Sequence, residues 1–295
     1  MLRHSFALLQ RNKMALSYAT QPRPPTRPPD GGLDIGCMNS AQSLTHAFKA
    51  PSLSLLATEP VRAMFDFVAS RLAAAAPPIG DGHPVVVFPG LGGAPFTTAQ
   101  LRRYLDQAGF QAHDWGRGMN TGPDGDFDPW LQGLVQHVRE LHGASGHKVS
   151  LVGWSLGGVY AREIAKLCPE SVRQVITLGT PFASLGGANH AGGIYKLLNR
   201  DSAQLTPELQ ARLRECPPVP TTSVYSKNDG VVSWRGCIEK KTATSESVEV
   251  TASHLGMVTN PEVLRIVVNR LAQPEGRWRA LRRGERLGTR RGVRA

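Results

Sequence analysis

Cysteine is scarce in this chain of 295 residues, which contains four of them. Four cysteines over that length are too few for a disulfide scaffold of the kind that staples small secreted domains. Cys168 falls at the end of a predicted helix, where we expect a packed thiol. Cys216 and Cys237 flank a predicted strand, so a bridge between these two remains an open alternative.

Long apolar runs are also lacking. The chain has no stretch of about 18 apolar residues, which argues against a membrane span. The N-terminus, MLRHSFALLQRNKMALSYATQPRPP, has no clean apolar core followed by a small-residue cleavage site. This pattern argues against a secretory signal. We therefore predict a cytoplasmic protein with no stable membrane insertion.

The body of the chain has little net charge, although the whole chain carries +11. Residues 1–30 contain five Lys or Arg and one Asp, and residues 274–295 contain eight Arg and two Glu. The 243 residues between them contain 21 basic and 20 acidic side chains. Because the basic excess lies at the two ends, we predict no nucleic-acid binding by the body.

Proline and glycine mark one boundary. Residues 21–32, QPRPPTRPPDGG, cannot form a packed core and indicate an extended linker. We predict a disordered N-terminal tail over 1–37, one domain over 38–273 and a basic, disordered tail over 274–295. A natural start at Met38 is an alternative reading of the first segment.

Short apolar runs alternate with helical patterns through the rest of the chain. The predicted strands cover 83–88, 111–116, 148–153, 172–179, 221–226 and 246–252, and the predicted helices cover 60–76, 97–110, 128–143, 156–167 and 260–272. Asp128 is the expected cap of the third helix, with Pro129 in its first turn. This alternation predicts an α/β fold whose parallel sheet is covered on both faces.

Residues 182–219 interrupt the alternation, because they have little strand character and are rich in glycine. We predict a small cap-like insertion above the sheet edge. It includes the amphipathic piece IYKLLNRDSAQL and apolar residues such as Phe182, Leu185, Ile194, Tyr195, Leu197 and Leu198. These side chains either line a binding site for an apolar group or simply pack the insertion onto the sheet.

A single serine stands in the segment KVSLVGWSLGG, between a predicted buried strand and a predicted helix. Ser155 is the centre of a G-x-S-x-G pattern, and its position at a sharp strand-to-helix turn is the one that a nucleophile needs. Side chains at 153 and 157 would collide with neighbouring backbone, which explains the glycines there. The alternative is a plain glycine-rich turn.

Serine needs a base, and the base needs a carboxylate. His254 lies in TASHLGM after the last predicted strand, at the carboxyl edge of the sheet where ligand chemistry gathers. Asp229 lies in the loop after the strand TTSVYS. Asp201 and Glu215 are rivals to it, but they belong to the insertion and its exit. A tetrahedral oxyanion also needs donors, and the backbone N–H groups of Leu91, in VVVFPGLGGAP, and Leu156 are the candidates.

Five motifs carry a resemblance to a known family: VVVFPGLGG, LVGWSLGG, VITLGTPF, YSKNDGVVSW and SHLGM. In this order they resemble the α/β-hydrolase superfamily over about residues 50–273, and more narrowly its bacterial lipase- and esterase-like members. The resemblance implies an α/β-hydrolase fold with a mostly parallel central sheet. Pro89 stands where lipases of this type often have histidine before the first glycine.

These observations together predict a serine carboxylic-ester hydrolase that acts through Ser155, Asp229, His254 and a covalent acyl-enzyme. The expected substrate is a small-molecule or lipid-like ester, contacted by Trp154, Phe182 and Leu185, and no cofactor or metal is implied. Two alternatives stay open: an acyltransferase with the same triad, and a non-catalytic binding module on the hydrolase fold. The oligomeric state is not predicted.

Overall fold

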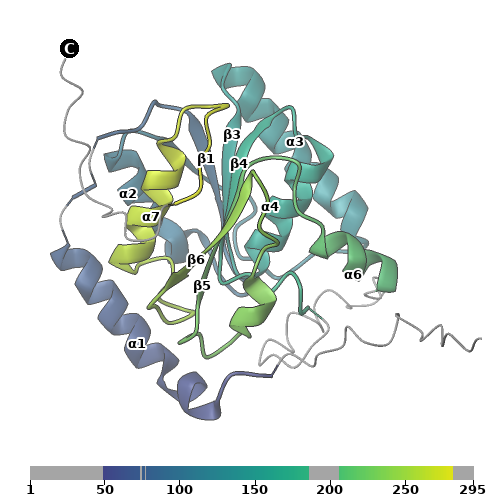
Figure 1. Cartoon of the computed structure of the whole chain (residues 1–295). Coiled ribbons are helices and arrows are strands. Elements are labelled where there is room, and N and C mark those ends of the chain that lie inside the picture. The colour runs from purple at the N-terminus through teal and green to yellow at the C-terminus, as the bar shows by residue number, and fades with distance from the viewer. Residues whose placement is uncertain (1–48, 74, 77, 186–205, 282–295) are drawn as a thin grey trace, which may run out of the picture. The chain divides into compact units, whose positions relative to one another are not determined.

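A six-stranded sheet is the centre of the computed structural model, which describes residues 49–73, 75–76, 78–185 and 206–281. Its order is β2-β1-β3-β4-β5-β6, and every neighbouring pair is parallel (Figure 1). The strands are β1 (Pro84–Phe88), β2 (Gln111–Asp114), β3 (Val149–Trp154), β4 (Val172–Leu178), β5 (Thr221–Ser226) and β6 (Ser245–Val250). The predicted parallel sheet is confirmed.

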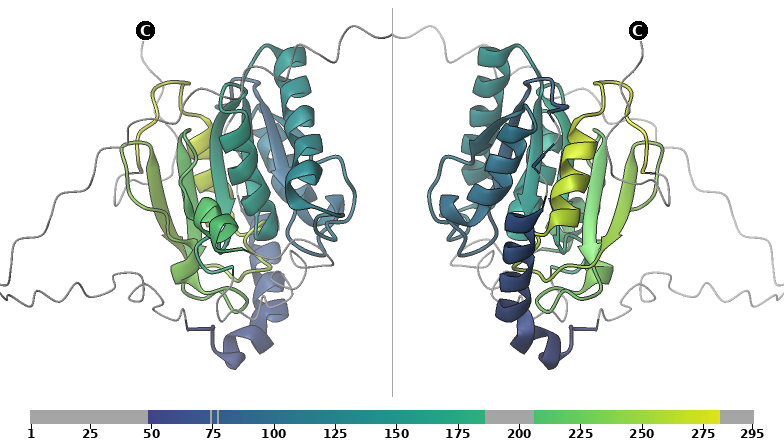
Figure 2. Two further views of the ribbon diagram at one scale, coloured as in Figure 1. Left: turned by 90° about the vertical axis from the view of Figure 1, so that its right-hand side faces the viewer. Right: turned by 90° about the vertical axis from the view of Figure 1, so that its left-hand side faces the viewer.

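Helices cover both faces of the sheet, as the two side views in Figure 2 show. The helices are α1 (Leu53–Leu72), α2 (Ala99–Gln107), α3 (Phe127–Ser145), α4 (Leu156–Leu167), α6 (Pro207–Arg214) and α7 (Pro261–Leu271), with the short turns η1 (Pro95–Thr98) and η2 (Trp234–Cys237). Residues of α3, α4 and α6 share one apolar core. Residues of α2 and α7 share the other core.

Strands β1, β3 and β4 are apolar because each of them supplies both cores. In β1, Val86 and Phe88 belong to the core under α3 and α4, whereas Val85 and Val87 belong to the core under α2 and α7. All five residues of this strand are buried. Strands buried on two faces appear in a sequence as continuous apolar runs, and it was this feature that identified them.

The first helix begins earlier than its pattern indicates. The sequence predicts a helix over 60–76, because apolar residues recur there at helical spacing. Instead α1 begins at Leu53, after Ser52 whose Oγ accepts from the Leu55 N–H at 3.3 Å, and Pro60 lies inside the helix. Large apolar side chains on its outward side are exposed, among them Val61, Met64, Phe65, Val68 and Leu72.

The expected cap of α3 is wrong by two residues. Asp126, not Asp128, is the N-cap residue, with extended backbone, and the helix begins at Phe127. Asp128 lies in the first turn, and its Oδ1 accepts from Arg212 of α6 at 2.6 Å. Pro129 remains in the first turn, where a missing N–H costs no helical hydrogen bond.

The predicted insertion is described in part. Helix α6 lies in it, and Leu213 packs into the core beside α4. The piece IYKLLNRDSAQL and the N-terminal tail lie outside the described residues. Of the predicted C-terminal tail, residues 274–281 are described, and the Leu281 N–H donates to Glu246 at 2.6 Å.

Two further expectations concern covalent links and charge. Cys216 and Cys237 are free thiols, so the bridge left open between them is absent.

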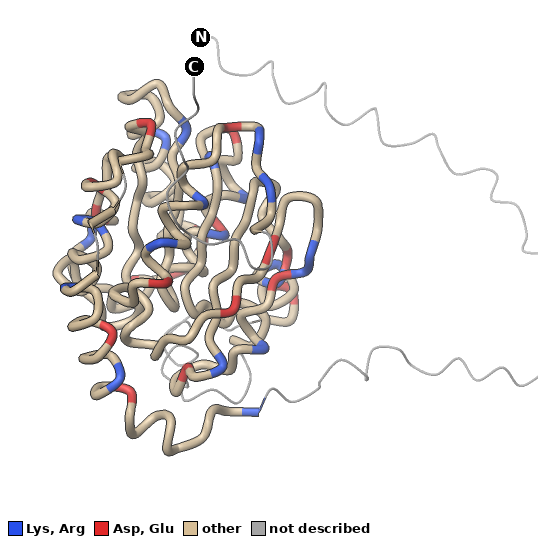
Figure 3. Tube along the Cα trace, turned by 60° about the vertical axis from the view of Figure 1, so that its left-hand side comes forward, with Lys and Arg blue, Asp and Glu red and all other residues tan. Residues whose placement is uncertain are grey.

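Acidic and basic positions are interspersed along the described chain (Figure 3). Among the described residues, no helix combines the length and apolar character needed to cross a bilayer.

Candidate active site

Ser155 occupies a strained turn between β3 and α4. Its φ of 52° and ψ of −122° make it the one non-glycine residue with positive φ in the described part of the chain. A Cβ at Gly153 would lie 2.4 Å from the Gly158 Cα, and one at Gly157 would lie 2.5 Å from the Phe88 carbonyl oxygen. The steric prediction for both glycines is therefore confirmed.

Gly158 is a third glycine that the turn requires, and the G-x-S-x-G pattern does not include it. A Cβ there would lie 1.9 Å from the Thr180 Oγ1. The close contact lets α4 run directly beside the end of β4. The second glycine of the sequence LGG was the available signal for this contact.

Ser155, His254 and Asp229 meet at the carboxyl edge of the sheet. The His254 Nε2 lies 3.1 Å from the Ser155 Oγ, and its Nδ1 lies 2.6 Å from the Asp229 Oδ2. The three residues follow β3, β6 and β5 respectively, and their exposed fractions are between 2% and 4%. Strands that run parallel end at the same edge, which is why residues far apart in sequence converge here.

The Asp229 carboxylate is held so that one oxygen faces the histidine. Its Oδ1 accepts from the N–H groups of Val231 and Val232, both at 2.8 Å. Its Oδ2 is then left to accept from the His254 Nδ1–H. With that proton on Nδ1, the Nε2 of a neutral imidazole is an acceptor directed at the Ser155 hydroxyl.

The electrostatic surroundings favour the charged form of His254. Burial by itself lowers the pKa of this imidazole, but the charge and hydrogen bond of Asp229 and the nearby Glu59 carboxylate raise it by more. The pKa of His254 therefore lies above its ordinary value. A histidine with this balance accepts a proton more readily than a free imidazole does.

Gly179, after β4, leaves space for the Asp–His pair. Its φ is +55°, and a Cβ there would lie 3.2 Å from both the Asp229 Oδ2 and the His254 Nδ1. This contact gives the motif VITLGTPF a physical role beside the site. The sequence singled out the motif without indicating what its glycine faces.

The loop after β1 lies beside the serine. A Cβ at Gly90 would lie 3.1 Å from the Ser155 Cβ and 3.2 Å from the Trp154 ring. Leu91 follows in this loop, and Leu156 is the first residue of α4, whose N–H has no acceptor within the helix. Both N–H groups therefore remain candidates for holding an oxyanion, and this role stays a prediction.

Asn120 fixes that loop and was missed by the sequence reasoning. Its side-chain Nδ2 donates to the Pro89 carbonyl at 2.8 Å. Its backbone carbonyl accepts from the Gly92 N–H at 2.8 Å, and its backbone N–H donates to the Gly93 carbonyl at 2.7 Å. Asn120 is fully buried. A lone asparagine after an edge strand gives no local signal of this contact.

The three expected substrate contacts are buried. Trp154 is 7% exposed, and its Nε1–H donates to the His254 carbonyl at 3.0 Å. The Arg162 guanidinium lies over the Phe182 ring, with its Cζ 3.7 Å from the ring centroid. Leu185 belongs to the core beneath α4. Both insertion residues thus make packing contacts, and their predicted contact with a substrate stays a prediction. Ile194, Tyr195, Leu197 and Leu198 lie outside the described residues.

A second Ser–His–Asp arrangement lies at the opposite, amino edge of the sheet. The His83 Nε2 is 2.8 Å from the Ser150 Oγ, and its Nδ1 contacts the Asp81 carboxylate. Ser150 lies within β3 and is wholly buried, with ordinary strand backbone instead of a turn. Burial lowers the pKa of His83 below its ordinary value, despite the Asp81 contact. The arrangement serves as an internal comparison for the site at Ser155.

The remaining candidate ligands do not gather into a further centre. In the described ranges, no cluster of three or more His, Cys, Asp or Glu side chains is arranged to hold a metal ion. Of the two rival acids, Asp201 lies outside the described residues, and the Glu215 carbonyl accepts from Arg162 at 2.9 Å.

Comparisons with known proteins point in one direction. The model of the alpha/beta hydrolase family matches residues 85–240. Two curated relatives named triacylglycerol lipase, from Pseudarthrobacter phenanthrenivorans and Burkholderia plantarii, are 28% identical over 139 residues, or 46% of this chain. The matched part spans 39% and 35% of their lengths. The fold is similar to that of Aspergillus fumigatus lipase B, with a TM-score of 0.51 at 18% identity over 70% of this chain and 57% of that one.

Proposed function

Because this chain belongs to the alpha/beta hydrolase family, we propose that it hydrolyses carboxylic esters with Ser155 as its nucleophile. One observation carries the proposal: the continuous contact from the Ser155 hydroxyl through His254 to Asp229, at a turn with positive φ. The relatives named triacylglycerol lipase support an ester as the substrate. We propose a small-molecule or lipid-like ester as the substrate, in keeping with the names of these relatives.

The first half of the reaction forms a bond to the serine. The His254 Nε2 takes the hydroxyl proton while the Ser155 Oγ attacks the ester carbonyl carbon. Asp229 holds the imidazole in the tautomer that accepts at Nε2, and its charge stabilises the imidazolium that forms. The N–H groups of Leu91 and Leu156 donate to the developing oxyanion.

The second half regenerates the enzyme. As the tetrahedral intermediate collapses, the bond to the alcohol breaks and His254 gives its proton to the leaving oxygen. The acyl group stays on Ser155. Water then attacks this acyl-enzyme, again giving a proton to His254, and the acid leaves as the proton returns to Ser155.

Hydrolysis of nitrophenyl esters of rising chain length tests the proposal directly. We expect turnover on the short-chain ester, and the chain length at which kcat/KM peaks reports the size of the acyl site. Since His254 must be neutral to act as base and its pKa is raised, kcat/KM should fall as the pH decreases through that raised value. No turnover on any ester of the series would contradict the proposal and favour the binding-module alternative.

Asn120 offers a separate test of the loop that carries Leu91. Asn120→Ala removes the donor to the Pro89 carbonyl, so the loop loses part of its support. We expect kcat to fall about 10- to 100-fold, because small displacements of catalytic groups are costly. Asn269→Ala, which removes a side chain that accepts from Arg270 on α7, is the matched control and should keep its kcat. Equal kcat values for the two variants would refute the role of Asn120.

A further inference from the structure

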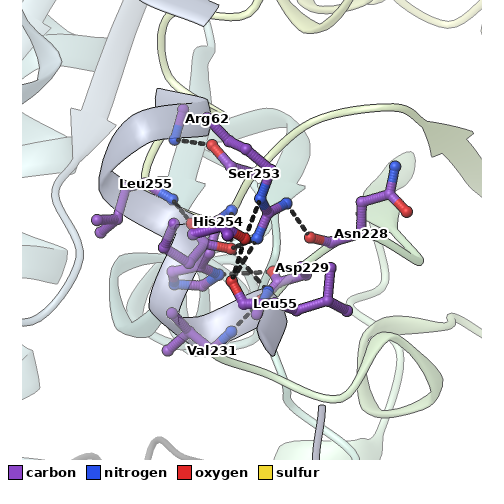
Figure 4. A network of polar contacts seen from close by, with 12 residues as sticks. Leu55, Arg62, Asn228, Asp229, Val231, Ser253, His254 and Leu255 are labelled. Carbon is purple, nitrogen blue, oxygen red and sulfur yellow. Dashed lines mark hydrogen bonds and ion pairs between the residues drawn. The ribbon is translucent and has the colours of Figure 1, made fainter. Parts of the chain in front are cut away.

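Glu59, on α1, is a carboxylate buried beside the candidate site. It is 2% exposed, and its two oxygens accept from several N–H donors. Its Oε1 accepts from the backbone N–H groups of Gly230 at 2.7 Å and His254 at 3.1 Å, and from the Arg62 guanidinium at 3.0 Å. Its Oε2 accepts from the Leu255 N–H at 3.1 Å. Figure 4 shows polar contacts of this region, with Arg62, Asp229, His254 and Leu255 labelled.

The backbone donors come from two separate loops. Gly230 directly follows Asp229 in the loop after β5, whereas His254 and Leu255 belong to the loop after β6. The acceptor for all three N–H groups is a single side chain, and the two at Gly230 and His254 are buried, where a backbone N–H needs an acceptor. Glu59 therefore joins the backbone that carries the acid to the backbone that carries the base.

Glycine stands at both points where α1 meets these loops. A Cβ at Gly230 would lie 2.5 Å from the Leu55 carbonyl group, and one at Gly256 would lie 2.0 Å from the Asp66 Oδ2. Gly230 does not have a positive φ, so the backbone conformation does not require glycine there. What excludes a side chain at this position is the close approach of α1. The absence of a side chain at these two positions lets both loops pack closely against α1.

Two other side chains of α1, Arg62 and Asp66, lie about one and two turns after Glu59 and contact the same loops. Arg62 donates to the carbonyls of Asn228 and, at 2.7 Å, of Leu55. The Asp66 Oδ2 accepts from the Ser253 N–H at 3.2 Å and from its hydroxyl at 2.9 Å. The contacts of α1 thus include the residues directly before Asp229 and His254, which are Asn228 and Ser253.

From these contacts we infer that Glu59 is a positioning residue, which sets the distance and orientation between Asp229 and His254. The inference rests on the proposed function, since it assigns Glu59 a part in the same reaction. His254 is then fixed at its N–H by Glu59, at its carbonyl by Trp154 and at its Nδ1 by Asp229. Only its Nε2 is directed at the serine.

The variant Glu59→Gln tests the inference while keeping the shape of the side chain. The amide turns an NH2 group toward backbone N–H donors, so at least one of these loses its acceptor. We expect kcat to fall on the order of 10- to 100-fold with KM little changed, because the loss is one of orientation. Glu59→Asp, which keeps the charge but is shorter, should also lower kcat.

The pH profile separates positioning from a merely structural role. Charged groups reach the surroundings of His254 from two elements. The loop after β5 contributes Asp229, and α1 contributes Glu59, Asp66 and the Arg62 that pairs with Glu59. The end of β3 and the turn after it contribute the neutral Trp154 and Ser155. The charge of Glu59 raises the pKa of His254. Glu59→Gln removes that charge, so the acid limb of kcat/KM should shift to lower pH in this variant. In Glu59→Asp the limb should stay near the wild-type position.

Glu246→Gln is the matched control. Glu246 is also a buried carboxylate, which accepts from Thr222 and Arg270 at 3.0 Å each, but it lies near the start of β6, at the opposite edge of the sheet. We expect this variant to lower the unfolding temperature without moving the acid limb. Amide hydrogen exchange over 228–231 and 253–256 should quicken in Glu59→Gln and not in Glu246→Gln.

The readouts distinguish failure of the inference from failure of the proposed function. Absence of ester turnover in the wild type would reject the proposed function, and hydrogen exchange would still test whether Glu59 holds the two loops. With an active wild type, three results together support the inference: lower kcat, an acid limb at lower pH and faster exchange in Glu59→Gln. Unchanged kcat and acid limb in folded Glu59→Gln, or unchanged exchange in both loops, would overturn it. If Glu59→Gln does not fold, wild-type kcat in Glu59→Asp overturns it equally.

Discussion

Ester turnover by Ser155→Ala should fall roughly 10⁴- to 10⁶-fold below that of the wild type. The substitution removes the atom that forms the acyl bond, so the covalent route is closed and only the oxyanion donors and substrate binding remain. The fold should survive, because the hydroxyl is not needed by the backbone of the turn: the Ser155 N–H donates to Leu178 and its carbonyl accepts from Gly158. Kinetics with a short-chain nitrophenyl ester, together with a thermal unfolding curve, measure both effects.

Ser150→Ala is the control for that experiment. Ser150 contacts a histidine at 2.8 Å, closer than the 3.1 Å at Ser155, and that histidine also contacts an aspartate. Ser150 is nevertheless wholly buried within a strand, so no ester can reach it. We expect this variant to retain wild-type kcat. Near wild-type turnover in Ser155→Ala would refute the assignment of the nucleophile.

The second large effect is expected for Asp229→Asn, with kcat lower on the order of 10⁴-fold. The N–H groups of Val231 and Val232 both donate to the position of Oδ1, so they hold the amide oxygen of the new side chain there. The NH2 group then faces the His254 Nδ1, which must become an acceptor. The proton moves to Nε2, and Ser155 loses its base.

This variant should also change the pH dependence of its residual activity. The charge and hydrogen bond of Asp229 raise the pKa of His254 against the lowering effect of burial. Removing the charge lowers that pKa, so the acid limb of kcat/KM moves to lower pH. Asp81→Asn, at the His83 arrangement, is the control and should keep both kcat and the limb. A limb that stays in place in Asp229→Asn would contradict the coupling.

The site could be predicted from sequence because its parts follow strand ends. Parallel strands place their carboxyl ends along one edge, so a serine after β3, an aspartate after β5 and a histidine after β6 can be brought together by topology alone. The glycines at 153 and 157 were predicted for a similar reason, since the turn itself excludes a Cβ. These inferences need only local patterns and the order of the elements.

The supports of the site could not be predicted in that way. The contact from Glu59 to His254 joins residues 195 positions apart, and the contact from Asn120 to Pro89 joins two loops. Neither residue belongs to a motif, and a lone Glu on a helix or Asn in a loop is usually solvated. The start of α1 was missed because the helical spacing of apolar residues was recognised only from Pro60, which lies within the helix.

Apolar residues near the site posed a different difficulty. Phe182 and Leu185 were candidates both for substrate contact and for packing. An apolar side chain suits either role, so the residue type does not distinguish them. Their exposed fractions of 3% and 6% are similar to the 4% of Ser155, so burial alone does not separate the two roles. What distinguishes lining from packing is the position of neighbours such as Arg162, which the sequence does not give.

Covalent labelling with a fluorophosphonate ester tests the central claim most directly, because the probe reports the activated hydroxyl itself. After reaction with the full chain and digestion, mass spectrometry should find a single adduct on the peptide that contains Ser155, absent from Ser155→Ala and slowed in Asp229→Asn. An unlabelled wild-type protein, or an adduct on another serine such as Ser150 with Ser155 unmodified, would contradict the account.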